Sequence, residues 1–240
     1  MIQKYSIDMK KIASFIATAI LCASCVFPIN TNGIKIGDGK TVKCGGPVTT
    51  NTFDLTGFNA ISVNGFTDME LFQGDQFQVI VKANEDVFQY LDYKVEEGVL
   101  VMETKEHVNI KAETYEVTVT LPTLKNLTVN GAGDVDLKTG YSSVEDLSVV
   151  INGAGDFELS GIKVPSFSIT LNGAGDIEAD GLDVENVSVA INGAGDINLS
   201  GKALKASFSV SGAGEIDASG LECDNVGTHK SGFAAIKLKK

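Results

Sequence analysis

One short phrase recurs five times in the second half of this 240-residue chain. It reads NGAGD at Asn130, Asn152, Asn172 and Asn192 and SGAGE at Ser211, so the steps between copies are 22, 20, 20 and 19 residues. A period near 20 is typical of proteins built from stacked structural units. This period therefore constrains the fold more than any other feature of the sequence.

Apolar and polar side chains alternate on both sides of each phrase. Around the second copy, Leu147, Val149 and Ile151 precede the phrase, and Phe157 and Leu159 follow it. A period of two indicates strands with one buried face, and glycines at fixed positions indicate corners between them. Because crossovers between parallel strands are right-handed, the sequence predicts an all-β, right-handed parallel β-helix, or β-solenoid, with rungs of about 20 residues.

The two halves of the chain differ in regularity. We predict regular rungs over residues 124–240, ending in a polar C-terminal cap, and a looser copy of the phrase at Asn64. Residues 51–123 are predicted to form an irregular β region continuous with the solenoid. This region consists either of longer rungs or of a small packed sheet, and Glu97-Gly98 marks a hairpin-like turn within it.

The N-terminus has the pattern of a targeting segment. Lys10 and Lys11 precede an apolar run, Ile12–Leu21, that is too short for a comfortable membrane span. Small residues directly before Cys25 indicate a bacterial lipoprotein signal, with an ordinary secretory signal as the alternative. We therefore predict a lipoprotein signal peptide at 1–25, a flexible tether at 26–50, and attachment to a lipid membrane through acyl chains on Cys25.

Charge and composition exclude one class of partner. The formal net charge is −12, and the chain contains neither Arg nor Trp. Nucleic-acid binding needs a basic face and commonly uses Arg, so we expect no nucleic-acid partner.

The asparagines of the phrase are candidates for a structural ladder. Stacked amides one rung apart can hydrogen-bond along the fold. The predicted ladder contains Asn64, Asn130, Asn152, Asn172 and Asn192.

Carboxylates recur four and six residues after the start of each phrase, on the outward face. The acidic strip that they form consists of Asp134, Asp136, Asp156, Glu158, Asp176, Glu178, Asp196, Glu215 and Asp217. Neighbouring carboxylates about 4.8 Å apart repel one another, by roughly 0.9 kcal/mol per pair in bulk water. Backbone N–H groups at the corners would offset this repulsion, and Ca²⁺ is the alternative. The strip is therefore a candidate surface for a cation or a partner; no other cofactor is expected.

Cysteines and histidines give weaker signals. Cys223 falls at an inward position, which favours a buried thiol over a disulfide with Cys44. His107 and His229 lack neighbours at metal-ligand spacing, so both are interpreted as surface residues.

The repeated V/I-N-G-A-G-D phrases, together with Phe58–Gly65 and Leu71–Asp75, resemble one family. This is the head GIN domain family of proposed auto-transporter adhesins, common in Bacteroides-type bacteria. The resemblance covers residues 48–238. It implies a β-helical protein of the cell envelope, often a lipoprotein, and supplies no catalytic motif.

We therefore expect a non-enzymatic, adhesin-like binding or presentation scaffold of the bacterial cell envelope, anchored at the outer membrane. A glycan or an extracellular protein is the expected partner. The alternatives are a polysaccharide-active lyase or hydrolase and an envelope assembly or stress partner. Missing Arg and regular rungs without long insertions argue against the enzyme.

Overall fold

The computed structural model describes residues 40–105 and 108–239. The predicted signal peptide with Cys25, most of the predicted tether, and His107 lie outside the described residues. Part of that tether forms strands, because β1 (Thr41–Lys43) pairs with β8 (Asn109–Lys111), and β2 (Val48–Phe53) begins before residue 50.

All other strands of the described residues belong to one sheet of 16 strands. Its N-terminal part contains β2, β3 (Ala60–Phe66), β4 (Asp68–Gln73), β5 (Gln78–Asn84), β6 (Leu91–Glu96), β7 (Val99–Thr104) and β9 (Tyr115–Leu121), with a short 3₁₀-helix, Glu85–Tyr90, between β5 and β6. The repeats contain β10 (Asn126–Ala132), β11 (Val135–Leu137), β12 (Tyr141–Ser142), β13 (Leu147–Ile151), β14 (Phe157–Glu158), β15 (Ile162–Leu171), β16 (Ile177–Ile191), β17 (Ala194–Glu222) and β18 (Val226–Leu238).

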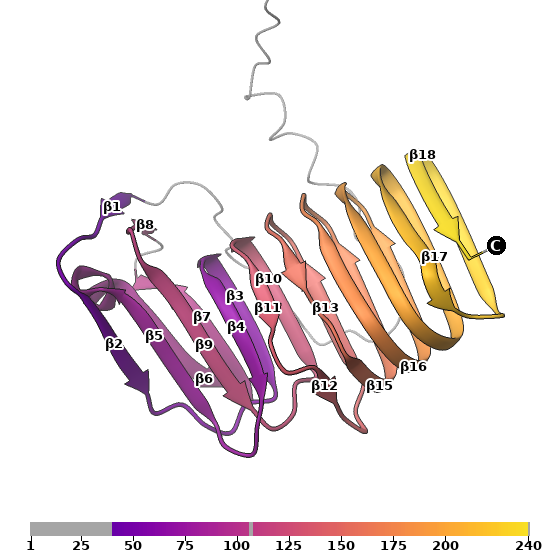
Figure 1. Cartoon of the computed structure of the whole chain (residues 1–240). Coiled ribbons are helices and arrows are strands. Elements are labelled where there is room, and N and C mark those ends of the chain that lie inside the picture. The colour runs from indigo at the N-terminus through magenta and orange to yellow at the C-terminus, as the bar shows by residue number, and fades with distance from the viewer. Residues whose placement is uncertain (1–39, 106–107, 240) are drawn as a thin grey trace, which may run out of the picture. The chain divides into compact units, whose positions relative to one another are not determined.

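Consecutive repeats lie side by side, and their strands pair in parallel (Figure 1). Ile151 is the register partner of Leu171, and Leu171 is the partner of Ile191. Equivalent residues of each repeat therefore form columns that run across the sheet. We call the strand before the NGAGD phrase the first segment of a repeat, the strand after it the second, and the short stretch beginning at Ile162 and its equivalents the third.

The alternating apolar residues face one hydrophobic core. Ile151, Leu171 and Ile191 are fully buried, and the large side chains of Phe157 and Phe167 are buried with them. The predicted direction of the apolar side chains in the repeats is therefore confirmed by their burial.

The predicted fold class, a right-handed parallel β-helix, is wrong, although the all-β class is confirmed. The structure is one large mixed sheet, in which β2 pairs antiparallel with β5, β5 with β9, and β6 with β7. For β6 and β7, the reason is the short connection between them. Glu97 and Gly98 both adopt positive φ angles, of 50° and 79°, and so tight a turn can join only antiparallel strands.

Candidate functional site

The five predicted ladder asparagines form a continuous chain of side-chain hydrogen bonds. Each Nδ2 donates to the Oδ1 of the asparagine one repeat earlier. The N···O distances are 2.9 Å from Asn130 to Asn64, 2.7 Å from Asn152 to Asn130, 2.8 Å from Asn172 to Asn152 and 2.8 Å from Asn192 to Asn172. These amides link repeats at the corner where the backbone turns, which is a structural role.

Replacing Asn172 by alanine removes the bonds to both neighbouring asparagines. We expect a loss of about 1–2 kcal/mol in the free energy of unfolding, since a typical hydrogen bond contributes about 1 kcal/mol net. The urea midpoint measures this loss. Asn198→Ala is the matched control, because the Asn198 side chain is exposed and makes no hydrogen bond to another described residue. Equal midpoints for the two variants would show that the ladder adds no stability.

Backbone N–H groups donate hydrogen bonds to the first column of the acidic strip. This column holds the carboxylates four residues after the start of each phrase. The Oδ1 atom of an aspartate accepts a hydrogen bond from the backbone N–H of the equivalent acidic residue one repeat later. Three such N···O distances are 3.0 Å from Asp156 to Asp134, 3.1 Å from Asp196 to Asp176 and 3.0 Å from Glu215 to Asp196. The column also includes Asp68, which accepts from Asp134 at 3.2 Å and which the sequence analysis missed because Phe66 and Thr67 replace the Ala-Gly of the phrase.

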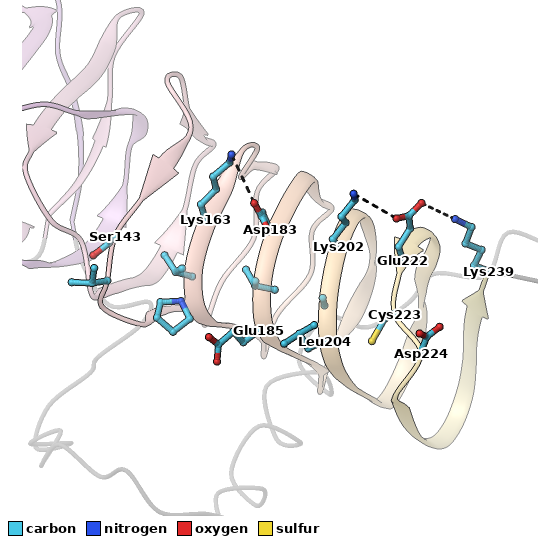
Figure 2. Close-up of a pocket in the computed structure, with 15 residues that line it drawn as sticks. Ser143, Lys163, Asp183, Glu185, Lys202, Leu204, Glu222, Cys223, Asp224 and Lys239 are labelled. Carbon is cyan, nitrogen blue, oxygen red and sulfur yellow. Dashed lines mark hydrogen bonds and ion pairs between the residues drawn. The ribbon is translucent and has the colours of Figure 1, made fainter.

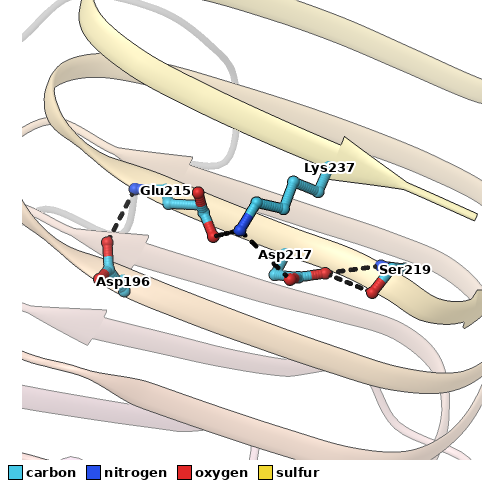
Figure 3. Close-up of polar contacts among 5 residues, drawn as sticks. All are labelled: Asp196, Glu215, Asp217, Ser219 and Lys237. Atoms are coloured by element: carbon cyan, nitrogen blue, oxygen red, sulfur yellow. Dashed lines mark hydrogen bonds and ion pairs between the residues drawn. The ribbon is translucent and has the colours of Figure 1, made fainter.

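Lysines neutralise the strip at both ends. Lys138 makes ion pairs with Glu70 and Asp136 at the N-terminal end. At the other end, Lys237 Nζ lies 2.5 Å from Glu215 Oε1 and 3.8 Å from Asp217 Oδ2 (Figure 3). Hydrogen bonds from the Ser219 hydroxyl and N–H, followed by the attraction of Lys237, lower the pKa of Asp217.

The middle of the strip has no such cation among the described residues. Here a hydrogen bond and the negative charge of Asp180 raise the pKa of Glu178, and repulsion from Glu158 adds to the shift. The folded chain therefore favours the neutral form of Glu178. The resulting stabilisation is present below the ordinary carboxyl pKa of about 4 and is lost as the pH rises through the raised value.

Glu178→Gln should therefore raise the melting temperature at pH 7 and change it little below pH 4. The expected gain is small, roughly 1–2 °C, because the carboxylate is exposed. Thermal unfolding followed by circular dichroism across this pH range measures the effect. Glu185→Gln, an exposed change outside the strip, is the control. A rise in melting temperature for Glu178→Gln that is the same at every pH would contradict the raised pKa of Glu178.

The strip presents no ready-made metal centre. Within residues 40–105 and 108–239, no group of three or more His, Cys, Asp or Glu is arranged to hold a metal ion. The carboxylates are instead spread along the sheet in columns. Some of them accept hydrogen bonds from backbone N–H groups. The geometry therefore gives the calcium hypothesis no coordinating cluster.

An open groove of about 1090 Å³ crosses the third segments of successive repeats (Figure 2). Val164, Val184, Ala203 and Cys223 are among the residues that line it, and the first three are buried. Five residues along one side alternate in charge from repeat to repeat: Lys163, Asp183, Lys202, Glu222 and Lys239. The groove is therefore shared by several repeats and does not belong to any single loop.

Ion pairs within this side of the groove hold its charges in place. The N···O distances are 3.8 Å from Lys163 to Asp183, 3.9 Å from Lys202 to Glu222 and 3.2 Å from Lys239 to Glu222. The hydrogen bond from Lys239, and then the attraction of Lys239 and Lys202, lower the pKa of Glu222. Glu222 therefore stays ionised at neutral pH, which is the opposite of what a general acid needs.

Exposed hydrophobic side chains lie in the same groove. Val144 is 91% exposed and Leu204 is 69% exposed. The offset of Leu204 within its repeat matches those of Val164 and Val184 and therefore predicts an inward position, and this prediction is wrong. The register shifts by one residue after Ala179, so that Ala203 pairs with Val184 and takes the buried place, while Leu204 turns outward.

The described residues include two cysteines, Cys44 and Cys223, and one histidine, His229. Cys44 and Cys223 are both free thiols, so they do not form a disulfide with each other. Cys44 is buried, whereas Cys223 is half-buried against the core. His229 is exposed, and the structure brings it to neither the groove nor the acidic strip.

Comparison with known proteins decides the family. The family model described as "Putative auto-transporter adhesin, head GIN domain" matches residues 57–239. The chain belongs to this family. The predicted resemblance is therefore confirmed, and membership in this adhesin family indicates a protein of the cell envelope or surface. No curated protein matches the sequence.

Solved structures related to this head GIN domain protein have the same fold. A protein described as a putative adhesin from Bacteroides fragilis is 18% identical, with a TM-score of 0.68 over 82% of this chain and 99% of that one. A protein described as a putative lipid binding protein from Parabacteroides distasonis is 23% identical, with a TM-score of 0.72 over 83% and 85%. A putative adhesin from Parabacteroides merdae is 20% identical, with a TM-score of 0.67 over 82% and 83%.

Among the residues that the structure describes, no helix has the length and apolar character needed to cross a bilayer.

Proposed function

We propose that this chain is a non-enzymatic, adhesin-like binding protein of the bacterial cell envelope. The third-segment groove would be its contact surface, and lipid on Cys25 would attach it to a membrane. The observation that carries the proposal is the exposure of Leu204 and Val144 inside an open groove bordered by paired charges. Exposed hydrophobic side chains in a surface depression typically mark interaction sites.

The shape of the groove favours an extended ligand. Neighbouring strands lie about 4.8 Å apart, so residues from successive repeats present a contact surface much longer than one sugar ring or one side chain. The charges on its side are paired with each other, so the groove does not select strongly for one sign of charge. We therefore propose a polymer as the ligand, either a glycan or an extended protein segment.

Binding of the full chain to a glycan and matrix-protein array tests the proposal, with and without millimolar calcium. Anionic and neutral lipid vesicles form a further arm, because one related structure is described as a putative lipid binding protein. Leu204→Asp should weaken binding at least about tenfold, as loss of a contact worth 1.4 kcal/mol does. Val48→Asp, which changes an exposed hydrophobic residue outside the groove, should have no effect.

Three outcomes would reject the proposal. Absence of binding across the array would remove the adhesin-like function. Equal losses for Leu204→Asp and Val48→Asp would remove the groove as its site. Depolymerisation of an arrayed polysaccharide would favour the enzyme instead.

A further inference from the structure

The last strand of the described residues, β18, lies at one edge of the sheet. Within the described residues, β18 (Val226–Leu238) pairs only with β17. Its second edge therefore presents a row of N–H and C=O groups without a strand partner, and such edges readily accept another strand. Figure 1 shows β18 at the end of the series of repeats.

The two halves of β18 differ in how well they are protected. In the first half, Thr228 and Lys230 occupy columns in which the preceding repeat buries Phe208 and Val210. A charge at an inward position is a common way to block pairing at an edge. The first half of β18 is therefore poorly suited to accept another strand.

The second half is apolar and uncovered. Ile236 and Leu238 continue the columns of Ile216 and Ala218, which are 0% and 1% exposed, yet Leu238 is 39% exposed. Phe233, in the same half, is 93% exposed. Among the described residues, no further repeat covers Ile236 and Leu238, whereas β18 itself covers Ile216 and Ala218.

We propose that a second copy of this chain covers this half of β18 by antiparallel pairing about a two-fold axis at Ile236. This register places Ala234 opposite Leu238 of the partner subunit, and Ile236 opposite Ile236 of the partner subunit. Directly opposed residues of an antiparallel pair lie on the same face, so the inward apolar side chains of both copies meet. A two-fold contact of this kind uses the same patch twice and closes after two copies.

Charge selects this register over its neighbour. In the proposed register, Lys237 lies opposite Ala235 of the partner subunit, and the Lys237 ammonium is already held by Glu215 and Asp217 of its own chain. A register centred on Lys237 would oppose two lysines, and like charges directly opposite each other are destabilising. The pairing is independent of the groove, so it goes beyond the proposed function.

The oligomeric state of the full chain tests this interface. Light scattering after size-exclusion chromatography should show a dimer that dissociates on dilution. Ile236→Lys should raise the dimer dissociation constant at least about thirtyfold, the effect expected of a central interface residue. Val144→Lys, at another exposed hydrophobic residue, should leave the dimer intact. Circular dichroism checks that both variants fold.

Cysteine cross-linking tests the register even if Ile236→Lys fails to fold. Directly opposed Cβ atoms are about 4.5–5.5 Å apart, so two copies of Ile236→Cys should form a reducible dimer under mild oxidation. Leu238→Cys should form no more disulfide-linked dimer than the parent chain does, because the two Leu238 positions would lie about 14 Å apart along the strands. A chain that stays monomeric at high concentration, or equal cross-linking by the two variants, would overturn the proposal. Either result leaves array binding through the groove untouched, so the two proposals fail separately.

Discussion

Replacing Gly153 by alanine is expected to disrupt the pairing of neighbouring repeats. A Cβ atom at this position would lie 1.6 Å from the carbonyl oxygen of Gly131 in the preceding repeat. The obstacle is backbone, which no side-chain rotation can remove. The same oxygen accepts a hydrogen bond from the Ala154 N–H at 2.9 Å, so moving the strands apart also breaks pairing. We expect a destabilisation of at least about 3 kcal/mol, which corresponds to a melting temperature roughly 6–12 °C lower.

Gly227→Ala is the matched control for this experiment. Gly227 also lies in a repeat strand, but the nearest atom to an added Cβ is the Ala206 carbonyl oxygen at 4.0 Å. Alanine there should leave stability unchanged or raise it slightly, because it reduces the freedom of the unfolded chain. Thermal unfolding of both variants gives the comparison. If Gly153→Ala and Gly227→Ala melted at the same temperature, the close approach of the two backbones would not require glycine at position 153.

The same steric argument extends along the whole column. A Cβ at Gly131, Gly173 or Gly193 would also lie within about 2 Å of a carbonyl oxygen in the preceding repeat. The repeated NGAGD phrase indicates that glycine is required at these positions. The alternating pattern does not show which backbone segments lie next to each other, so it does not give the reason. The fixed spacing of the glycines indicated corners between strands, whereas the first glycine of the phrase is required mainly for close approach of two backbones.

Strand positions were easier to predict than strand directions. The alternation in Val99–Met102 and in Tyr115–Leu121 is typical of strands, and the structure has β7 and β9 there. Alternation has the same period in parallel and antiparallel sheets, so the pattern alone could not decide between longer parallel rungs and a small packed sheet in residues 51–123. The Glu97-Gly98 turn was the one local signal of reversal, because two residues cannot span a crossover between parallel strands.

The groove could not be found from composition or motifs. Its lining residues occupy both inward and outward positions of the third segments, and none of them belongs to the NGAGD phrase. One signal was present, because the step from Asn192 to Ser211 is 19 residues instead of 20. A missing residue must shift the register somewhere in that repeat, and with a period of two a shift by one residue exchanges inward and outward faces. The structure places that exchange at Ala203 and Leu204.

Phe167→Ala and Leu204→Ala test this exchange directly and should differ greatly in stability. Phe167 is 1% exposed in the core, so its truncation leaves a cavity and is expected to cost about 3–5 kcal/mol. Leu204 is 69% exposed, and its truncation should change the free energy of unfolding by less than about 0.5 kcal/mol. Urea unfolding monitored by circular dichroism measures both values. A loss of several kcal/mol for Leu204→Ala would place Leu204 in the core and with it remove the exposed hydrophobic residue on which the proposed contact surface depends.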